Sequence, residues 1–201
     1  MVEAGERRGA DRVRAFIALA PPPATVDAIG GWQRAALSER PGLRPIAPDA
    51  LHLTLVFLGD CDRDRIEAAR RALARASAPA APVPIRLERP IGLPGRRPRV
   101  VAFAATSPAA VGLHRRLRAE LDDGDPARPG PRPFRPHLSV ARVRGDPRGR
   151  RAREAVAGLP PLAGPGHTFD AVRVALYRSQ LRSQGARYSV LADVDLPQSG
   201  G

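Results

Sequence analysis

Lysine is absent from this sequence, and cysteine, methionine and tryptophan occur once each. Because Cys61 stands alone, the chain cannot form an internal disulfide bond or a metal cage of several cysteines. Its apolar runs, such as residues 55–58 and 100–105, are no longer than a strand, so we expect no membrane-spanning helix. Residues 1–12 are polar and charged and lack the apolar core of a signal peptide. These absences predict a cytoplasmic protein without disulfide bonds.

Aromatic residues are also scarce, at 4% of the chain, whereas all 33 basic residues are arginine and the formal net charge is +13. One explanation is compositional bias, because alanine, proline and glycine are abundant as well. The other is an anionic partner, because the planar guanidinium group of arginine matches the oxygens of a phosphate. The few aromatic rings leave few surfaces on which nucleic-acid bases could stack. Charge alone therefore does not identify a nucleic-acid-binding protein.

Strand-like and helix-like patterns alternate between a polar arm (residues 1–12), expected to be disordered, and a flexible tail (residues 197–201). Strands are predicted at residues 12–20, 51–58, 83–88 (at a sheet edge), 100–106, 134–143, 168–179 and 186–196. Helices are predicted at residues 24–40, 63–78 (capped by Asp62), 108–121 and 148–159. Loops are predicted at residues 89–98 and 122–133, and a hairpin turn at 180–185. This order predicts an α+β protein in which residues 13–196 form a single domain of two similar lobes.

Two of the four histidines begin the same short pattern: a histidine, an apolar residue, a hydroxyl residue and another apolar residue. The pattern occurs at residues 52–55 (HLTL) and again at residues 137–140 (HLSV). Only 12 residues are serine or threonine, so two such matches arise by chance in roughly one chain in a thousand. Either histidine alone is more readily explained as a partly buried strand residue. The repetition favours a shared function.

Alternate residues of a strand point to the same side, so each histidine shares a face with the hydroxyl residue two positions later. These pairs are His52 with Thr54 and His137 with Ser139. Cleavage of a phosphodiester requires a base that activates the nucleophile and an acid that protonates the leaving oxygen. Histidine performs either role near neutral pH. The hydroxyl groups can donate hydrogen bonds to the non-bridging phosphate oxygens.

A positive charge, Arg142, follows the second pattern, but it has the strand parity of the apolar residue Val140. It reaches the histidine face only if the strand bends or ends there. The remaining histidines, His114 and His167, have no hydroxyl two positions later, and we assign them no role. No cluster of histidines and carboxylates has the spacing of metal ligands, so no metal site is predicted. A lone cysteine such as Cys61 is more often packing than a nucleophile.

Several segments resemble the two-histidine phosphoesterases, and in particular the bacterial RNA 2′,3′-cyclic phosphodiesterases, also called 2′–5′ RNA ligases. The resemblance covers roughly residues 12 to 195. Each segment is weakly specific, and their order along the chain carries the resemblance. The segments are FIAL (16–19), LHLTLVFLG (51–59), RVVAFAAT (99–106), FRPHLSVAR (134–142) and YRSQLRSQGARYSVL (177–191).

The resemblance implies a bilobal α+β fold with pseudo-twofold symmetry, in which two antiparallel sheets face a central cleft and helices lie outside. It implies hydrolysis of an RNA 2′,3′-cyclic phosphate to a 2′-phosphomonoester, without a metal or other cofactor. The implied partner is RNA or a nucleotide that ends in a 2′,3′-cyclic phosphate. No membrane and no obligate protein partner are implied, and the protein is expected to be a monomer.

The resemblance also assigns residues, by their position in the matching motifs. His52 and His137 are the catalytic pair, and the hydroxyls of Thr54 and Ser139 hold the phosphate. We assign His137 as the base and His52 as the acid, although the pseudo-symmetry makes the reverse order nearly equivalent. Serine at position 139 replaces the more common threonine and keeps the hydroxyl.

Three further assignments concern the rest of the substrate. Arg142 is implied to contact the phosphate or the base. Phe16 is implied to stack on a nucleobase, with core packing as the alternative. Residues 91–103 lack the Phe-Pro and Trp that relatives often carry, which leaves the nucleobase contacts open. The arginines at 96, 97 and 99 would suit an RNA backbone but are more simply a solvated loop.

Three other functions are consistent with the same motifs. RNA ligation would use the same residues, with a 5′-hydroxyl in place of water as the nucleophile. A phosphodiesterase acting on another cyclic or 2′-phosphorylated nucleotide would need no further change. A nucleotide-binding or RNA-binding module without turnover is the alternative from another class, and the intact motifs argue against it.

Overall fold

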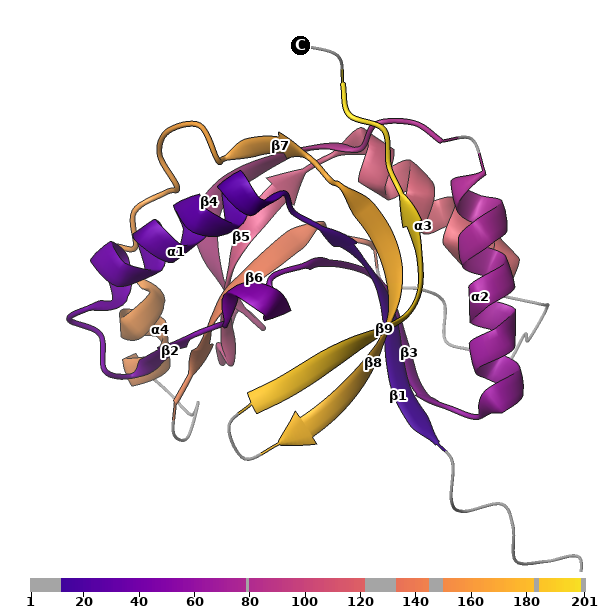
Figure 1. Ribbon diagram of the computed structural model, residues 1–201. Helices are drawn as coiled ribbons and strands as arrows, with labels where there is room; N and C mark the ends of the chain where they lie inside the picture. Colours follow the sequence, from indigo (N-terminus) through magenta and orange to yellow (C-terminus); the bar gives the residue numbers. More distant parts are fainter. Residues whose placement is uncertain (1–11, 79, 122–132, 145–149, 183–184, 200–201) are drawn as a thin grey trace, which may run out of the picture.

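The computed structural model describes residues 12–78, 80–121, 133–144, 150–182 and 185–199. Nearly all of the predicted arm and of the loop at 122–133, and the end of the predicted tail, lie outside the described residues. Nine strands, four α-helices and one 3-10 turn are described (Figure 1). In chain order they are β1 (Val13–Ala20), α1 (Pro23–Leu37), β2 (Leu43–Pro45), η1 (Pro48–Ala50), β3 (Leu53–Cys61), α2 (Arg63–Ser77), β4 (Pro84–Leu93), β5 (Val100–Thr106), α3 (Pro108–Leu121), β6 (His137–Val143), α4 (Arg150–Val156), β7 (Thr168–Asp170), β8 (Arg173–Arg182) and β9 (Gly185–Asp195).

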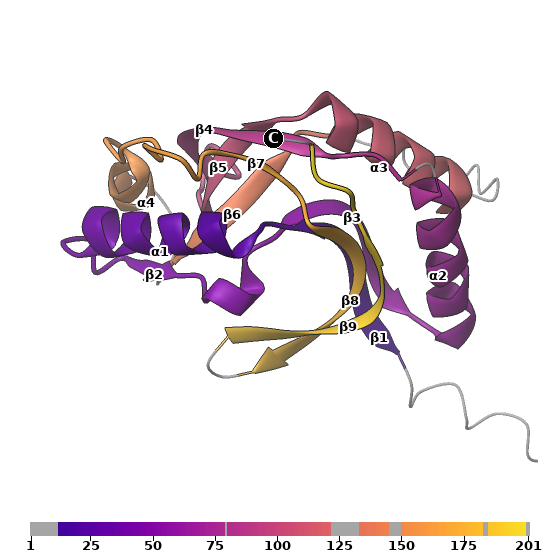
Figure 2. The same cartoon turned by 45° about the horizontal axis from the view of Figure 1, so that its top comes forward.

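The strands form one curled antiparallel sheet in the order β7-β4-β5-β6-β3-β1-β8-β9, with β2 paired to β6. We call β3, β1, β8 and β9 the first half, and β6, β5, β4, β7 and β2 the second half. A single residue pair, Leu53 with Leu138, joins the halves through β3 and β6. The α+β class is therefore confirmed. The two expected sheets are the halves of one sheet that bends at this joint (Figures 1 and 2).

The helices lie outside the curl, and two of them cross from one half to the other. Helix α1 follows β1 of the first half but packs on the second half, where the ring of Trp32 meets Phe103 at 4.8 Å. Helix α3 follows β5 of the second half but lies beside α2 over the first half (Figure 2). No helix within the described ranges has the length and apolarity needed to cross a bilayer.

Helix α2 forms where the sequence pattern predicts it. The carboxylate of Asp62 accepts a hydrogen bond from the Arg65 amide (2.9 Å), which caps the first turn. The apolar stripe faces the sheet, and its members are all buried: Ile66, Ala69, Leu73 and Ala76. Capping and periodicity thus specify where the helix begins and which face it buries.

Three features of the second half differ from the prediction. Strand β4 is not at the edge, because the three-residue strand β7 pairs with its first residues. It also runs five residues beyond the predicted end at 88.

The strand predicted at 168–179 is broken in two. Ala171 donates to the Val83 carbonyl of the second half, and Val172 donates to the Ala20 carbonyl of the first (3.1 and 3.0 Å). The chain therefore leaves one half and enters the other at this point.

Candidate active site

The joint between the halves brings the two histidine patterns together. Since β3 and β6 run antiparallel and Leu53 pairs with Leu138, the same register sets His52 beside Ser139 and Thr54 beside His137. The leucines are fully buried, at 1% and 0% exposure. The four polar residues alternate with them and lie on the opposite, concave face. A pseudo-twofold axis through the leucine pair therefore relates the two patterns.

Each histidine ring is held by the same local hydrogen bond. Nδ1 of His52 donates to the carbonyl of Ala50 (2.8 Å), and Nδ1 of His137 donates to the carbonyl of Arg135 (2.9 Å). A carbonyl oxygen can only accept, so Nδ1 carries the proton in both rings and Nε2 is left to accept or give one. The turn η1 presents the Ala50 carbonyl, and Pro136 holds Arg135 extended.

Strands β3 and β6 each contain a β-bulge, three residues after His52 and His137 respectively. In β6 the pairing with β5 passes from Ser139 directly to Ala141 and skips Val140. In β3 the pairing with β1 passes from Thr54 directly to Val56 and skips Leu55. A bulge inserts one unpaired residue and reverses the alternation of side chains beyond it.

The bulge in β6 resolves the parity of Arg142. Val140 and Ala141 are both buried, at 0% exposure, and the exposed Arg142 consequently shares the face of Ser139. The strand bends, as the sequence required for this residue to reach the site. The corresponding residue beyond the β3 bulge is Phe57, because both residues stand five positions after their histidine.

Each bulge is held by a side chain from a helix that crosses between the halves. Nε2 of Gln33, on α1, donates to the Val140 carbonyl (2.8 Å) and to the Ile46 carbonyl (2.9 Å). Nδ1 of His114, on α3, donates to the Leu55 carbonyl (2.8 Å). The Val140 and Leu55 carbonyls belong to the residues that the strand registers skip, and the Val140 carbonyl also accepts from the Ile46 amide (3.0 Å). Sequence reasoning gave His114 and Gln33 no role, because neither contact is visible without the helix crossing.

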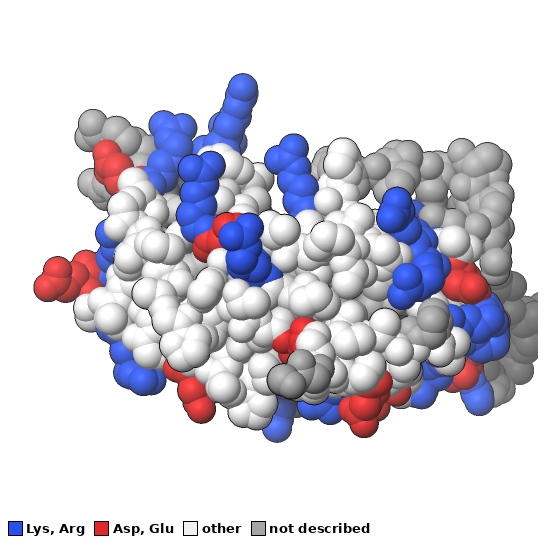
Figure 3. All heavy atoms as spheres, turned by 90° about the horizontal axis from the view of Figure 1, so that it is seen from above, with Lys and Arg blue, Asp and Glu red and all other residues white. Residues whose placement is uncertain are grey.

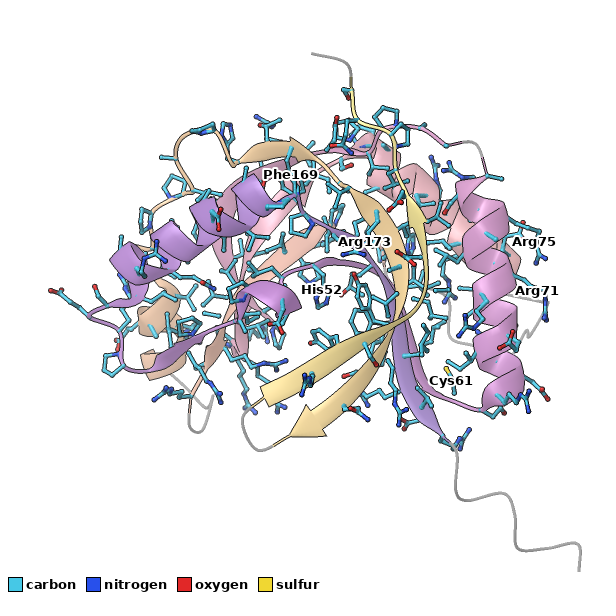
Figure 4. All side chains as sticks on the ribbon, in the orientation of Figure 1. His52, Cys61, Arg71, Arg75, Phe169 and Arg173 are labelled. Atoms are coloured by element: carbon cyan, nitrogen blue, oxygen red, sulfur yellow. The ribbon has the colours of Figure 1, made fainter. Side chains whose placement is uncertain are left out.

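A pocket of about 240 Å³ opens at the concave face of the joint. His52, which lies near the centre of the curl in Figure 4, lines it together with Ser139 and Arg142. Two further residues were not predicted: Arg44, the register partner of Arg142, and Tyr188. The other lining residues are Pro45, Ile46, Ala47, Ala50, Val100 and Ala186. Two arginines, and no carboxylate among these residues, make the pocket suited to an anion.

An aromatic cluster supports His52 from the first half. The Phe16 ring lies 4.8 Å from the His52 ring and stacks on Tyr177 at 5.2 Å, while Tyr188 meets His52 edge-on at 5.2 Å. Phe16 is only 4% exposed. This burial favours the packing alternative for Phe16, and the aromatic surface open to the pocket belongs to Tyr188.

The surroundings of His52 shift its titration. Burial is the largest cause and lowers the pKa of His52 below its ordinary value of 6.5, because the charged ring loses hydration. The hydrogen bond to Ala50 opposes this, and the positive groups of His137 and Arg142 lower the pKa further. That His137 and Arg142 lower the pKa of His52 agrees with their positions near it at the joint. His52 is neutral in the unliganded pocket near pH 7.

Other reactive groups lie apart from the pocket. The thiol of Cys61 is buried near α2 (Figure 4), and burial raises its pKa, which suits packing rather than nucleophilic attack. Within the described ranges, no three His, Cys, Asp or Glu side chains are grouped as metal ligands. On the face shown in Figure 3 the arginines are spread out among acidic side chains. The anion-binding character is thus a property of the pocket rather than of that face.

The pocket is lined by His52 from the first half and Ser139 from the second, and Thr54 and His137 are their register neighbours at the joint rather than lining residues. A curled antiparallel sheet that carries a histidine and a hydroxyl residue from each half at one joint defines a two-histidine phosphoesterase architecture. Residues 21–181 match the family model of the 2′-5′ RNA ligase superfamily, and the chain belongs to this superfamily. An RNA 2′,3′-cyclic phosphodiesterase of Thermus thermophilus is 33% identical over 179 residues, which cover 81% of this chain and 84% of that protein.

Solved structures agree with this assignment. The crystal structure of a Thermus thermophilus protein, TT0787, has a TM-score of 0.76 at 30% identity and covers 91% of this chain and 97% of its own. E. coli LigT complexed with 3′-AMP has a TM-score of 0.73 at 25% identity and covers 94% and 100%. Apo LigT gives 0.72 at 25% identity with the same coverage.

Proposed function

We propose that this protein is an RNA 2′,3′-cyclic phosphodiesterase, which hydrolyses a terminal 2′,3′-cyclic phosphate to a 2′-phosphomonoester. The observation that carries the proposal is the Leu53–Leu138 joint, whose register sets His52 beside Ser139 and Thr54 beside His137. A pocket lined by His52, Ser139 and two arginines opens at this joint. The name of the Thermus thermophilus relative supports the same substrate and reaction.

The proposed reaction is a single displacement at phosphorus. One histidine accepts a proton from water at Nε2 as the water oxygen bonds to phosphorus. The bond from phosphorus to the 3′ oxygen breaks, and the other histidine donates its Nε2 proton to that oxygen. Water is consumed, and the 2′-phosphate and a free 3′-hydroxyl are the products. Since the histidines make both proton transfers, the scheme requires no metal-activated water.

The remaining residues of the proposed site act on the charge that develops on the phosphate. The hydroxyls of Thr54 and Ser139 donate hydrogen bonds to its non-bridging oxygens, one from each half of the sheet. Arg142 and Arg44, opposite each other on β6 and β2, supply positive charge at the same face. Two arginines placed side by side repel each other, and a bound anion relieves this repulsion.

The protonation of His52 before substrate binds does not by itself decide which histidine is the acid. The low pKa of His52 favours the neutral ring before substrate binds. A bound phosphate anion offsets the charge of Arg142 and therefore raises that pKa. We retain His137 as the base and His52 as the acid.

A diester with a p-nitrophenolate leaving group needs no acid, so it should restore turnover in His52→Ala but not in His137→Ala. Restoration in the other variant would reverse the order.

Ligation is the second candidate function, favoured by membership in a superfamily named for it. An RNA 5′-hydroxyl in place of water would attack the same phosphorus and expel the same 3′ oxygen. The catalytic residues are thus shared, and the two reactions compete for one bound substrate.

End-group analysis of an oligonucleotide that carries a 2′,3′-cyclic phosphate tests the proposal. The expected product is a 2′-phosphate, formed equally with and without EDTA. A joined 2′–5′ product in the presence of a 5′-hydroxyl RNA would favour ligation. Loss of turnover in EDTA, a 3′-phosphate product, or binding of 2′-AMP without hydrolysis of the cyclic phosphate would contradict the proposal.

A further inference from the structure

Phe57 occupies the position in β3 that Arg142 occupies in β6, five residues after the histidine and beyond the bulge. Phe57 is 55% exposed, and Val190 at 45% is the other exposed large hydrophobic residue of the described chain. The register places them at the two ends of one row across the first half. Phe57 pairs with Phe16, Phe16 with Tyr177, and Tyr177 with Val190.

This row begins within the candidate site and extends out of it. The Phe16 ring contacts His52 at 4.8 Å, and Phe57 is the cross-strand neighbour of Phe16. Phe57 stands five residues after His52 along the chain, and one of the residues between them is the bulge residue. At about 3.3 Å a residue, roughly 13–16 Å separate their Cα atoms. A stacked strand of nucleic acid, with bases roughly 3.4 Å apart, covers that distance in about four to five nucleotides.

Arg14 completes the surface at this end of the row. Its guanidinium carbon lies 4.7 Å from the centroid of the Phe57 ring. Asp60 is the register partner of Arg14, which balances the local charge. A flat ring with a stacked guanidinium and little net charge suits the face of a base better than a phosphate.

We propose that Phe57 and Arg14 form a subsite that stacks a nucleobase of the RNA upstream of the terminal cyclic phosphate. This inference rests on the proposed function. Because a cyclic phosphate ends the chain, the only further nucleotides lie on its 5′ side. A second protein copy is a poorer occupant, since one phenylalanine and one valine are far from the roughly 1,600 Å² of a stable interface.

The test compares a 2′,3′-cyclic mononucleotide with oligonucleotides of two to six residues that end in the same group. Wild-type protein should gain in kcat/KM with length, by roughly tenfold to a hundredfold, which is the effect of one base stacked on an aromatic ring. Phe57→Ala should lose this gain, and Phe57→Trp should retain it. Turnover of the mononucleotide should stay the same in both variants and reports correct folding.

Val190→Ala is the matched control, because it removes an exposed apolar side chain at the opposite end of the row and should keep the length dependence. If Val190→Ala rather than Phe57→Ala abolished the gain, the subsite would be misplaced. An equal loss on mononucleotide and oligonucleotide, no gain with length in the wild type, or a changed oligomeric state in Phe57→Ala would overturn the inference. Failure to hydrolyse the mononucleotide would instead contradict the proposed function itself.

Discussion

The two histidine units have the same backbone and different surroundings. Both histidines donate Nδ1 to a carbonyl two residues earlier, and both strands bulge one residue after the hydroxyl. Beyond the bulge one unit presents Arg142 and the other Phe57. Ring contacts in the described chain gather around His52, whose neighbours are Phe16 and Tyr188. The comparison teaches that the backbone symmetry places two histidines with the same local hydrogen bond, while the side chains beyond the bulges differ. On the proposed function, this difference assigns the phosphate to Arg142 and an upstream base to Phe57.

Removal of either histidine should have the largest effect. His52→Ala and His137→Ala should each lower kcat by about 10²–10⁴-fold, because each removes one proton transfer. The double variant should be little worse than either single one, since the two residues act in one step. Steady-state kinetics on a cyclic-phosphate substrate measures both.

His167 offers the control for these variants. Its Nδ1 also donates to a carbonyl, that of Gly164 (2.7 Å), but it lies outside the pocket. His167→Ala should retain near wild-type kcat. Full activity in either His52→Ala or His137→Ala would contradict the proposed mechanism.

A tenfold effect is expected where α1 holds the bulge of β6. Gln33→Leu removes the donor to the Val140 carbonyl and should displace Arg142, which raises KM by about tenfold with a smaller change in kcat. Because Gln33 acts through Arg142, a double variant with Arg142→Ala should add little to Arg142→Ala alone. Additive losses in this cycle would show that Gln33 matters only for stability.

His114→Leu is the counterpart on the other side of the pseudo-twofold axis. It removes the donor to the Leu55 carbonyl and should disturb Phe57 rather than Arg142. Its effect should therefore appear with long oligonucleotides more than with a mononucleotide. Equal effects of Gln33→Leu and His114→Leu on both substrates would contradict the proposal that the two halves contact different parts of the substrate.

The smallest expected effect is on stability as a function of pH. The folded pKa of His52 lies below 6.5, so the unfolded chain binds the proton more readily. His52 therefore costs no stability well above pH 6.5, and the free energy of unfolding falls as the pH drops from 6.5 through the lowered pKa. In thermal unfolding, wild type should lose on the order of a few degrees more than His52→Gln between pH 7.5 and 5. An identical loss in the two proteins would argue against the buried, neutral histidine.

Local sequence patterns were sufficient to predict several features of this site and of the elements around it. The alternation of leucines with His52 and Thr54 predicts which side of the strand faces the cleft, and the cap at Asp62 predicts where α2 begins. The direction of Arg142 could not be predicted, because the bulge depends on Gln33 and on pairing with β5. The contribution of Tyr188 was also missed, since only the curl of β9 brings it over His52. Sequence periodicity reports the faces of a regular strand, and the site lies where the strands are irregular.

The exchange of helices between the halves has a consequence for how the chain can be divided. A cut between α2 and β4 would separate β1 from its partner β8 and would leave Trp32 of α1 without Phe103. Neither fragment would contain a complete buried layer of its own. The duplicated appearance of the motifs therefore does not correspond to two separable modules, and we expect the two halves to unfold together in one cooperative transition.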